Sequence, residues 1–232
     1  MTRLGAIACS LVLLVPYRLV AADEELPDGG PDDAGAALDP ALRWLESARE
    51  CLDGAFSFEA DFTQELIHPL GNPTGPMRGR VQLRRGDRLR LDYRKPRRRL
   101  VVSDGEIVRA WDPENRTVIE TRSARSPIHA AFRFALAAGG SDDFTARLLG
   151  GPGDPARGGP AVLELIPLRE SPLVERVLVT LVPDCPPVRR VVLIDRAGCA
   201  VRITFFEARL DAGIGHRRFV FEPPPGARVV RP

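Results

Sequence analysis

A two-residue period of apolar and polar side chains runs through residues 58–64, FEADFTQ. Its apolar or small positions are Phe58, Ala60 and Phe62. Residues 88–94 repeat the pattern, with charged side chains between the apolar ones. Those apolar ones are Leu89, Leu91 and Tyr93. This alternation is typical of a β-strand that has one face in a core and the other in water.

Most of the chain after residue 55 follows the same pattern, and Gly or Pro stands in nearly every gap. The predicted strands are 56–67, 77–84, 88–94, 98–103, 106–111, 116–121, 143–149, 162–167, 174–182, 188–195, 199–208 and 217–222, with a short extended tail at 227–231. About eleven antiparallel strands cannot all lie flat, so we expect the sheet to curl with one dry concave face.

Two segments have helical spacing instead. Asp39 and Pro40 form a preferred helix start, so we predict a helix over 40–51. A second helix is predicted over 128–138, where Gly139 follows its end. Two helices are too few to wrap the sheet, but they can lie across one open side of it. That arrangement leaves an apolar interior that is either filled by side chains or open to a ligand.

The first 22 residues have the layout of a secretory signal. A basic residue precedes an apolar run at residues 4–15, and small residues end the segment at Ala22. We predict cleavage after Ala22 rather than lipid attachment at Cys9, which lies inside the run. The run is too short for a permanent anchor. The mature chain is therefore expected to be exported and soluble, with a flexible acidic leader at 23–38 and a single domain at 39–232.

The net charge of the predicted mature chain argues against nucleic acid as a partner. The formal charge of +2 comes from the predicted signal, which holds Arg3 and Arg18 and no acidic residue. Without them, 33 basic residues become 31, against 31 acidic ones. A neutral exported protein has no long-range field for nucleic acid, so none is expected as a partner. The basic run at 94–99 is interpreted as a solvated strand edge or turn rather than a lipid-headgroup or partner patch.

Three cysteines remain after the predicted cleavage: Cys51, Cys185 and Cys199. If 188–195 and 199–206 form a hairpin, Cys185 and Cys199 lie more than about 20 Å apart, beyond bonding reach. We expect no bridge between these two. A bridge from Cys51 to either of them stays open.

Residues that carry chemistry are scattered. His68, His129 and His216 lie far apart and match no metal motif. The chain has no nucleophile elbow, no phosphate loop and no CxxC pair. We therefore expect a protein that is not an enzyme, with no catalytic residues, no metal and no cofactor. A hydrolase that uses the cleft is a weaker alternative, with only generic carboxylates in its favour.

Five stretches occur in one order and span nearly the whole predicted mature chain: SFEADFTQ, GRVQLRRGDRLRLDY, LVVSDGEIVRAWDP, IDRAGCAVRITFFEARLD and FVFEPPPGARVV. Together they resemble the LolA family of periplasmic lipoprotein carriers of Gram-negative bacteria. The resemblance implies a mainly β fold, a half-open antiparallel β-barrel of about eleven strands. Helices would form a lid over an apolar cavity.

The function that this resemblance implies is transport without bond chemistry. The carrier would shield the acyl chains of lipoproteins in the periplasm, receive them from an inner-membrane export complex and deliver them to an outer-membrane acceptor. Neutral charge and a lidded cavity agree with a monomer. The alternative on the same fold is a binding protein or sensor for a free lipid or a mislocalised lipoprotein.

The residues expected to line the acyl-chain cavity are Phe58, Phe62, Leu83, Leu89, Leu91, Trp111, Ile128 and Phe132. The alternative for the strand positions is an ordinary filled core. Ile128 and Phe132 are four apart and so share one face of the predicted helix. In the family, an arginine followed by proline holds the lid shut. Here Arg85 is the expected lid latch, although Gly86 replaces the proline and Leu89 the aromatic that follows.

Overall fold

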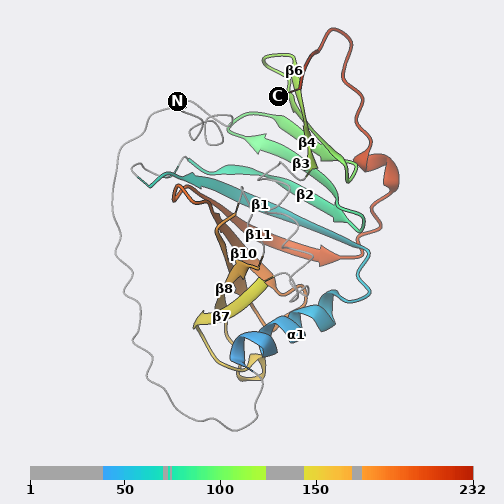
Figure 1. Cartoon of the computed structure of the whole chain (residues 1–232). Helices are drawn as coiled ribbons and strands as arrows, with labels where there is room; N and C mark the ends of the chain where they lie inside the picture. The colour runs from blue at the N-terminus through green and yellow to red at the C-terminus, as the bar shows by residue number, and fades with distance from the viewer. Residues whose placement is uncertain (1–38, 70–72, 74, 124–143, 169–173, 232) are drawn as a thin grey trace.

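The computed structural model describes residues 39–69, 73, 75–123, 144–168 and 174–231. Within these residues twelve strands form one sheet (Figure 1). In chain order they are β1 (Ser57–Ile67), β2 (Met77–Arg84), β3 (Arg88–Lys95), β4 (Arg99–Ser103), β5 (Ile107–Asp112), β6 (Thr117–Arg122), β7 (Phe144–Gly150), β8 (Ala161–Pro167), β9 (Arg176–Leu181), β10 (Val188–Ile194), β11 (Ala200–Leu210) and β12 (Arg228–Val230).

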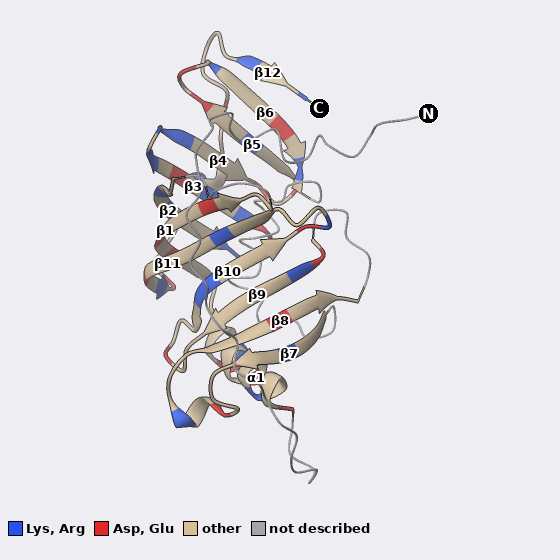
Figure 2. Ribbon diagram, turned by 90° about the vertical axis from the view of Figure 1, so that its left-hand side faces the viewer, with Lys and Arg blue, Asp and Glu red and all other residues tan. Residues whose placement is uncertain are grey.

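Two antiparallel meanders make up this sheet. Strands β1 to β6 follow one another as neighbours, and so do β7 to β11. The pairing of β1 with β11 joins the meanders, and β12 lies parallel to β6. Figure 2 shows the order from β12 at one end of the molecule to β7 at the other. These two edge strands do not pair with each other among the described strands, so the sheet is open, in agreement with a half-open barrel.

The predicted strand at 217–222 is wrong. Residues His216–Phe219 form the short 3-10 helix η4 instead. Phe219 is 2% exposed whereas Val220 is 53% exposed, and only the first of them packs inward. Three prolines follow at 223–225, and proline cannot donate the backbone hydrogen bonds of a ladder. The extended tail predicted after them is present and forms β12.

Helix α1 (Pro40–Leu52) confirms the first predicted helix and its cap. The side chain of Asp39 accepts a hydrogen bond from the backbone N–H of Ala41 at 2.8 Å. Two residues after the helix, Gly54 has a φ of 89°, which glycine adopts without steric cost. The apolar face of α1 buries Trp44 and Leu45 against the sheet side of the molecule.

A disulfide ties the end of α1 to the turn between β9 and β10. It joins Cys51 to Cys185, with the two Cα atoms 5.8 Å apart. The pairing that the sequence left open is thereby settled. Because Cys185 bonds to Cys51, the expectation that it does not pair with Cys199 is confirmed. Cys199 is half-buried at the turn between β10 and β11.

The segment between β7 and β8 packs against α1. The indole N–H of Trp44 donates to the carbonyl oxygen of Pro152 at 2.7 Å. A guanidinium nitrogen of Arg43 lies 3.6 Å from the carboxylate of Asp154, just before the 3-10 helix η3 (Pro155–Arg157). Together with the disulfide, these contacts fix α1 at the β7 end of the sheet.

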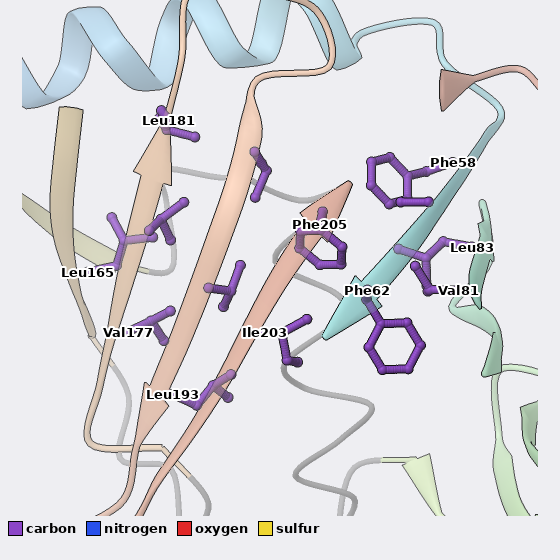
Figure 3. Packing of buried hydrophobic residues seen from close by; sticks show 14 of the residues in the cluster. Phe58, Phe62, Val81, Leu83, Leu165, Val177, Leu181, Leu193, Ile203 and Phe205 are labelled. Carbon is purple, nitrogen blue, oxygen red and sulfur yellow. The ribbon is translucent and has the colours of Figure 1, made fainter. Parts of the chain in front are cut away.

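One face of the sheet, here called the inner face, is apolar across both meanders. Residues that are direct partners in a ladder share a face. One such row crosses four strands and is fully buried: Ile203, Val191, Val179 and Leu163. Figure 3 shows Ile203 with Phe205, Phe58 and Phe62 in the same core. Twelve flat strands would be roughly 50 Å wide, whereas α1 is about 20 Å long and therefore covers only part of that face.

Three predictions fall outside the described residues. These are the signal at 1–22, the leader at 23–38 and the second helix at 128–138. In the part of the chain that the structure describes, no helix has both the length and the apolar character that crossing a membrane requires.

Candidate functional site

The central strands bring five of the predicted cavity residues together. Phe58, Phe62, Leu83, Leu89 and Leu91 all lie on the inner face and are at most 4% exposed. The ring of Phe58 packs edge-on against Phe205, and that of Phe62 packs edge-on against Tyr93, with centroids 5.5 and 5.3 Å apart. In this structure these side chains fill the centre of the core.

Space for a ligand lies at the end of the inner face farthest from α1. A pocket of about 290 Å³ opens there over β3 to β6. Its apolar wall consists of Met77, Tyr93, Val101, Ala110 and Ile119. Val101, Ala110 and Ile119 are direct partners across β4, β5 and β6. Ala110 and Ile119 are only half-buried, so this part of the inner face is accessible.

Trp111, another of the predicted cavity residues, is among the residues that line this pocket. Its ladder partners are Leu100 and Val118, which share the face opposite to Ala110. The indole of Trp111 therefore belongs to the outer face, and the residue contributes to the edge of the pocket rather than to its floor.

Basic side chains surround the pocket, and they are here called the basic rim: Lys95, Arg97, Arg99 and Arg228. Three come from the β3–β4 hairpin, where Lys95 ends β3, Arg97 lies in the turn and Arg99 begins β4, whereas Arg228 comes from β12. Arg97 lies 3.0 Å from the carboxylate of Glu114, and Arg99 lies 3.4 Å from that of Asp112. Neither Lys95 nor Arg228 has a carboxylate partner among the described residues. The pocket thus combines an apolar floor with an excess of positive charge at its opening.

A buried polar pair lies behind the pocket wall. The hydroxyl of Tyr93 donates to Oε1 of Gln64 at 2.6 Å, and Gln64 is fully buried. Burial raises the pKa of Tyr93, so its phenol stays neutral. Nε2 of Gln64 has no hydrogen-bond partner within the described part of the chain. Sequence reasoning did not single out this pair.

Arg85, the expected lid latch, makes a contact with the segment that follows α1. Its Nε donates to the carbonyl oxygen of Ala55 at 2.7 Å, and its backbone N–H donates to that of Phe56 at 3.1 Å. The β2–β3 turn is thereby bound to the connection between α1 and β1. The two remaining predicted cavity residues, Ile128 and Phe132, lie outside the described residues.

The outer face of the same strands is charged. Glu59 accepts from Nε2 of Gln82 at 2.6 Å and from Arg209 at 2.8 Å, and Arg80 donates to Asp61 at 2.9 Å. Burial opposes ionisation of Glu59, but these hydrogen bonds and the nearby guanidinium groups outweigh it and lower its pKa. The hydrogen bond from Arg80 likewise lowers the pKa of Asp61. Among the described residues, no group of His, Cys, Asp or Glu has an arrangement that could hold a metal ion.

Comparison with known proteins now identifies the family. The family model "Outer membrane lipoprotein carrier protein LolA" matches residues 53–222, which include every strand except β12. The chain belongs to the LolA family. Among curated LolA-family relatives, the outer-membrane lipoprotein carrier protein of Methylococcus capsulatus is 30% identical over 182 residues, which cover 77% of this chain and 83% of the relative. That of Methylobacillus flagellatus is 27% identical over 187 residues, covering 80% and 88%.

A solved structure agrees with this LolA-family fold. An uncharacterized conserved protein from Thermus thermophilus superposes with a TM-score of 0.50 at 14% identity. The match covers 83% of this chain and 99% of that one. At this identity the likeness concerns the fold alone.

Proposed function

We propose that this LolA-family chain is a non-catalytic carrier that works in the periplasm. Its inner face would shield the acyl chains of lipoproteins between an inner-membrane export complex and an outer-membrane acceptor. The observation that carries the proposal is the apolar inner face, continuous across both meanders and open at the pocket. Curated relatives that bear the name of outer-membrane lipoprotein carriers support the same class of cargo.

Hydrocarbon transfer explains why such a carrier is needed. Each methylene group that leaves an apolar environment for water costs about 0.8 kcal/mol, so a multiply acylated protein stays in its membrane. An apolar inner face offers the chains an equivalent environment. An empty carrier must also cover that face to stay soluble, and the packing of Phe58 and Phe62 against their neighbours does so.

Loading therefore requires the inner face to open. Typical small-molecule sites enclose roughly 300–1,000 Å³, so a pocket of about 290 Å³ suits one chain and not several. The Cys51–Cys185 disulfide and the Trp44–Pro152 hydrogen bond hold α1 at the β7 end. We propose that the side held by the Arg85 hydrogen bond to Ala55 is the one that releases, and that Arg85 is the latch of the empty form.

The size of the pocket favours a second candidate function. A protein that binds one free lipid needs no larger opening than the structure has. The same fold would then serve as a binding protein or sensor for that lipid, or as a sensor of mislocalised lipoproteins.

Mass spectrometry of the protein purified from its own periplasm separates these functions. Co-purified acylated protein is expected for the lipoprotein carrier. Extractable lipid without any acylated protein would instead favour the lipid-binding protein. Recovery of neither, together with turnover of an ester substrate, would contradict both.

Replacing Arg85 tests the latch. Arg85→Leu removes a charge-assisted hydrogen bond from the closed empty form, so the loaded form becomes relatively more stable. Uptake of acylated cargo should stay intact, and transfer to acceptor membranes should slow by about tenfold. Arg189→Leu, on β10, is the matched control, because it removes an arginine that lies outside the β2–β3 turn.

Both variants are compared in a transfer assay with purified acylated cargo. If Arg85→Leu hands over cargo at the rate of the wild type, the latch role is wrong and the carrier function stands untouched. Failure of the wild type to take up acylated protein would contradict the carrier function itself.

A further inference from the structure

The basic rim gives the pocket positive charge, which a site that only shields acyl chains from water does not require. An acyl chain needs only the apolar floor of Val101, Ala110 and Ile119. Four cations nevertheless converge on the opening from two segments that are more than a hundred residues apart in the chain. Lys95, Arg97 and Arg228 are exposed to solvent beside a floor that is only half-buried.

Charge within the rim is unbalanced. The carboxylates of Asp112 and Glu114 each meet one arginine of the rim. Lys95 and Arg228 have no carboxylate partner among the described residues. Each of them lines the pocket and is available for a charge-assisted hydrogen bond with an anionic group. The rim is therefore complementary to a negatively charged group.

We infer that this pocket binds a single-chain amphiphile with an anionic head, such as a carboxylate or phosphate on one acyl chain. The chain would lie on Val101, Ala110 and Ile119, and the head would meet Lys95 and Arg228. A volume of about 290 Å³ lies at the lower limit of small-molecule sites, roughly 300 Å³, and suits one chain. The inference goes beyond the proposed lipoprotein cargo and does not depend on it.

The basic run at 94–99 combines the solvated turn expected from sequence with a place in the pocket. Residues 94–98 are exposed, as that expectation requires. Lys95, Pro96 and Arg97 also line the same pocket as Arg228 of β12. Strand β12 reaches that position through its parallel ladder with β6, which pairs Arg228 with Thr117. The turn and the added strand thus build one site.

Calorimetric titration with monomeric amphiphiles tests the inference. The probes are dodecanoate and dodecyl phosphate, each below its micelle concentration, and uncharged dodecyl glycerol with the same chain. The wild type should bind both anions about tenfold more tightly than the uncharged probe, and the preference should shrink as salt is raised.

Three variants separate the rim from the floor. Lys95→Gln/Arg228→Gln should remove the preference for anions and leave binding of dodecyl glycerol unchanged. Ala110→Phe should fill the floor and weaken all three probes. Arg189→Gln on β10 is the matched control, because it removes one cation from the other meander. Unfolding curves of each variant identify any that fail to fold.

The results of these titrations, together with vesicle binding, distinguish a ligand bound in the pocket from attachment of the protein to a membrane surface. Equal affinity of the wild type for charged and uncharged probes would overturn the inference, and so would an unchanged preference in Lys95→Gln/Arg228→Gln. Binding to vesicles of phosphatidylglycerol and phosphatidylcholine without binding to either monomeric anion would also overturn it. Failure of lipoprotein uptake, by contrast, would contradict only the proposed carrier function.

Discussion

At the scale of single residues, Gln64 is a polar side chain that is fully buried in the apolar core. It lies on the inner face, where its ladder partners are Met77 and Ile203. The hydrogen bond from Tyr93 satisfies one end of its amide and leaves Nε2 unpaired among the described residues. A buried polar group without a hydrogen-bond partner destabilises the folded state. Loss of the hydrogen bond from Tyr93 should therefore lower the free energy of unfolding by more than loss of an exposed one would.

Removing the Tyr93 hydroxyl tests this reasoning. Tyr93→Phe leaves the whole amide of Gln64 without a hydrogen-bond partner among the described residues and should lower the free energy of unfolding by about 1–3 kcal/mol. Tyr93→Phe/Gln64→Leu removes both polar groups and should recover most of that loss. Urea unfolding of the two single variants and the double variant completes the cycle. Strictly additive losses would show that the pair is not coupled.

Alternation along 58–64 was enough to place Gln64 on the same side as Phe62. It was not enough to find its partner, since Tyr93 lies 29 residues away and reaches Gln64 only through the register of β1, β2 and β3. The same limit applies to the basic rim. The run at 94–99 was visible in the sequence, but the parallel addition of β12 that brings Arg228 to it was not.

At the scale of elements, cross-links hold α1 in place in addition to the packing of its buried apolar face. Its end is bonded to the β9–β10 turn through Cys51 and Cys185, which are separated by 134 residues. Trp44 adds a hydrogen bond to Pro152. A bridge that closes so long a loop removes much of the freedom of the unfolded chain.

Loss of the Cys51–Cys185 disulfide should lower the free energy of unfolding more than most single changes do. Cys51→Ser/Cys185→Ser is expected to lower the free energy of unfolding by about 2–5 kcal/mol. Denaturant unfolding under oxidising conditions measures it. Cys199→Ser is the control and should change stability by less than about 1 kcal/mol. A double variant as stable as the wild type would mean that packing alone holds α1.

Sequence patterns predicted most elements because each strand carries its own period of two. The exception at 217–222 mixes Arg, Phe and Val in a way that also looks alternating. What decides its structure is Arg218, whose Nε donates to Gln82 at 3.2 Å, and Phe219, which packs inward. Both are tertiary contacts, and propensity for a strand yields to them.

At the scale of the whole molecule, ionised carboxylates in several parts of the sheet link stability to pH. The pKa values of Glu59, Asp61, Asp104 and Asp112 all lie below their ordinary values. A group with a lowered pKa in the folded state contributes stability above its unfolded pKa. That contribution is lost as pH falls through the folded pKa.

Acid should therefore destabilise the protein below about pH 4.5, the ordinary value for Glu59. Guanidinium unfolding between pH 7 and pH 3 measures the effect. Glu59→Gln should make the free energy of unfolding depend less steeply on pH in that range. Glu50→Gln, on the exposed side of α1, is the matched control. Identical slopes for Glu59→Gln and the wild type would contradict this assignment.

The junction of the two meanders has a consequence for how the protein is made. One edge of β1 is covered by β2 within a few residues, whereas the other waits for β11, more than 130 residues further along. Until synthesis reaches that late strand, the hydrogen-bonding groups along one edge of β1 can pair with the edge of another β-sheet. The nascent chain is thus most prone to aggregation before β11 is made.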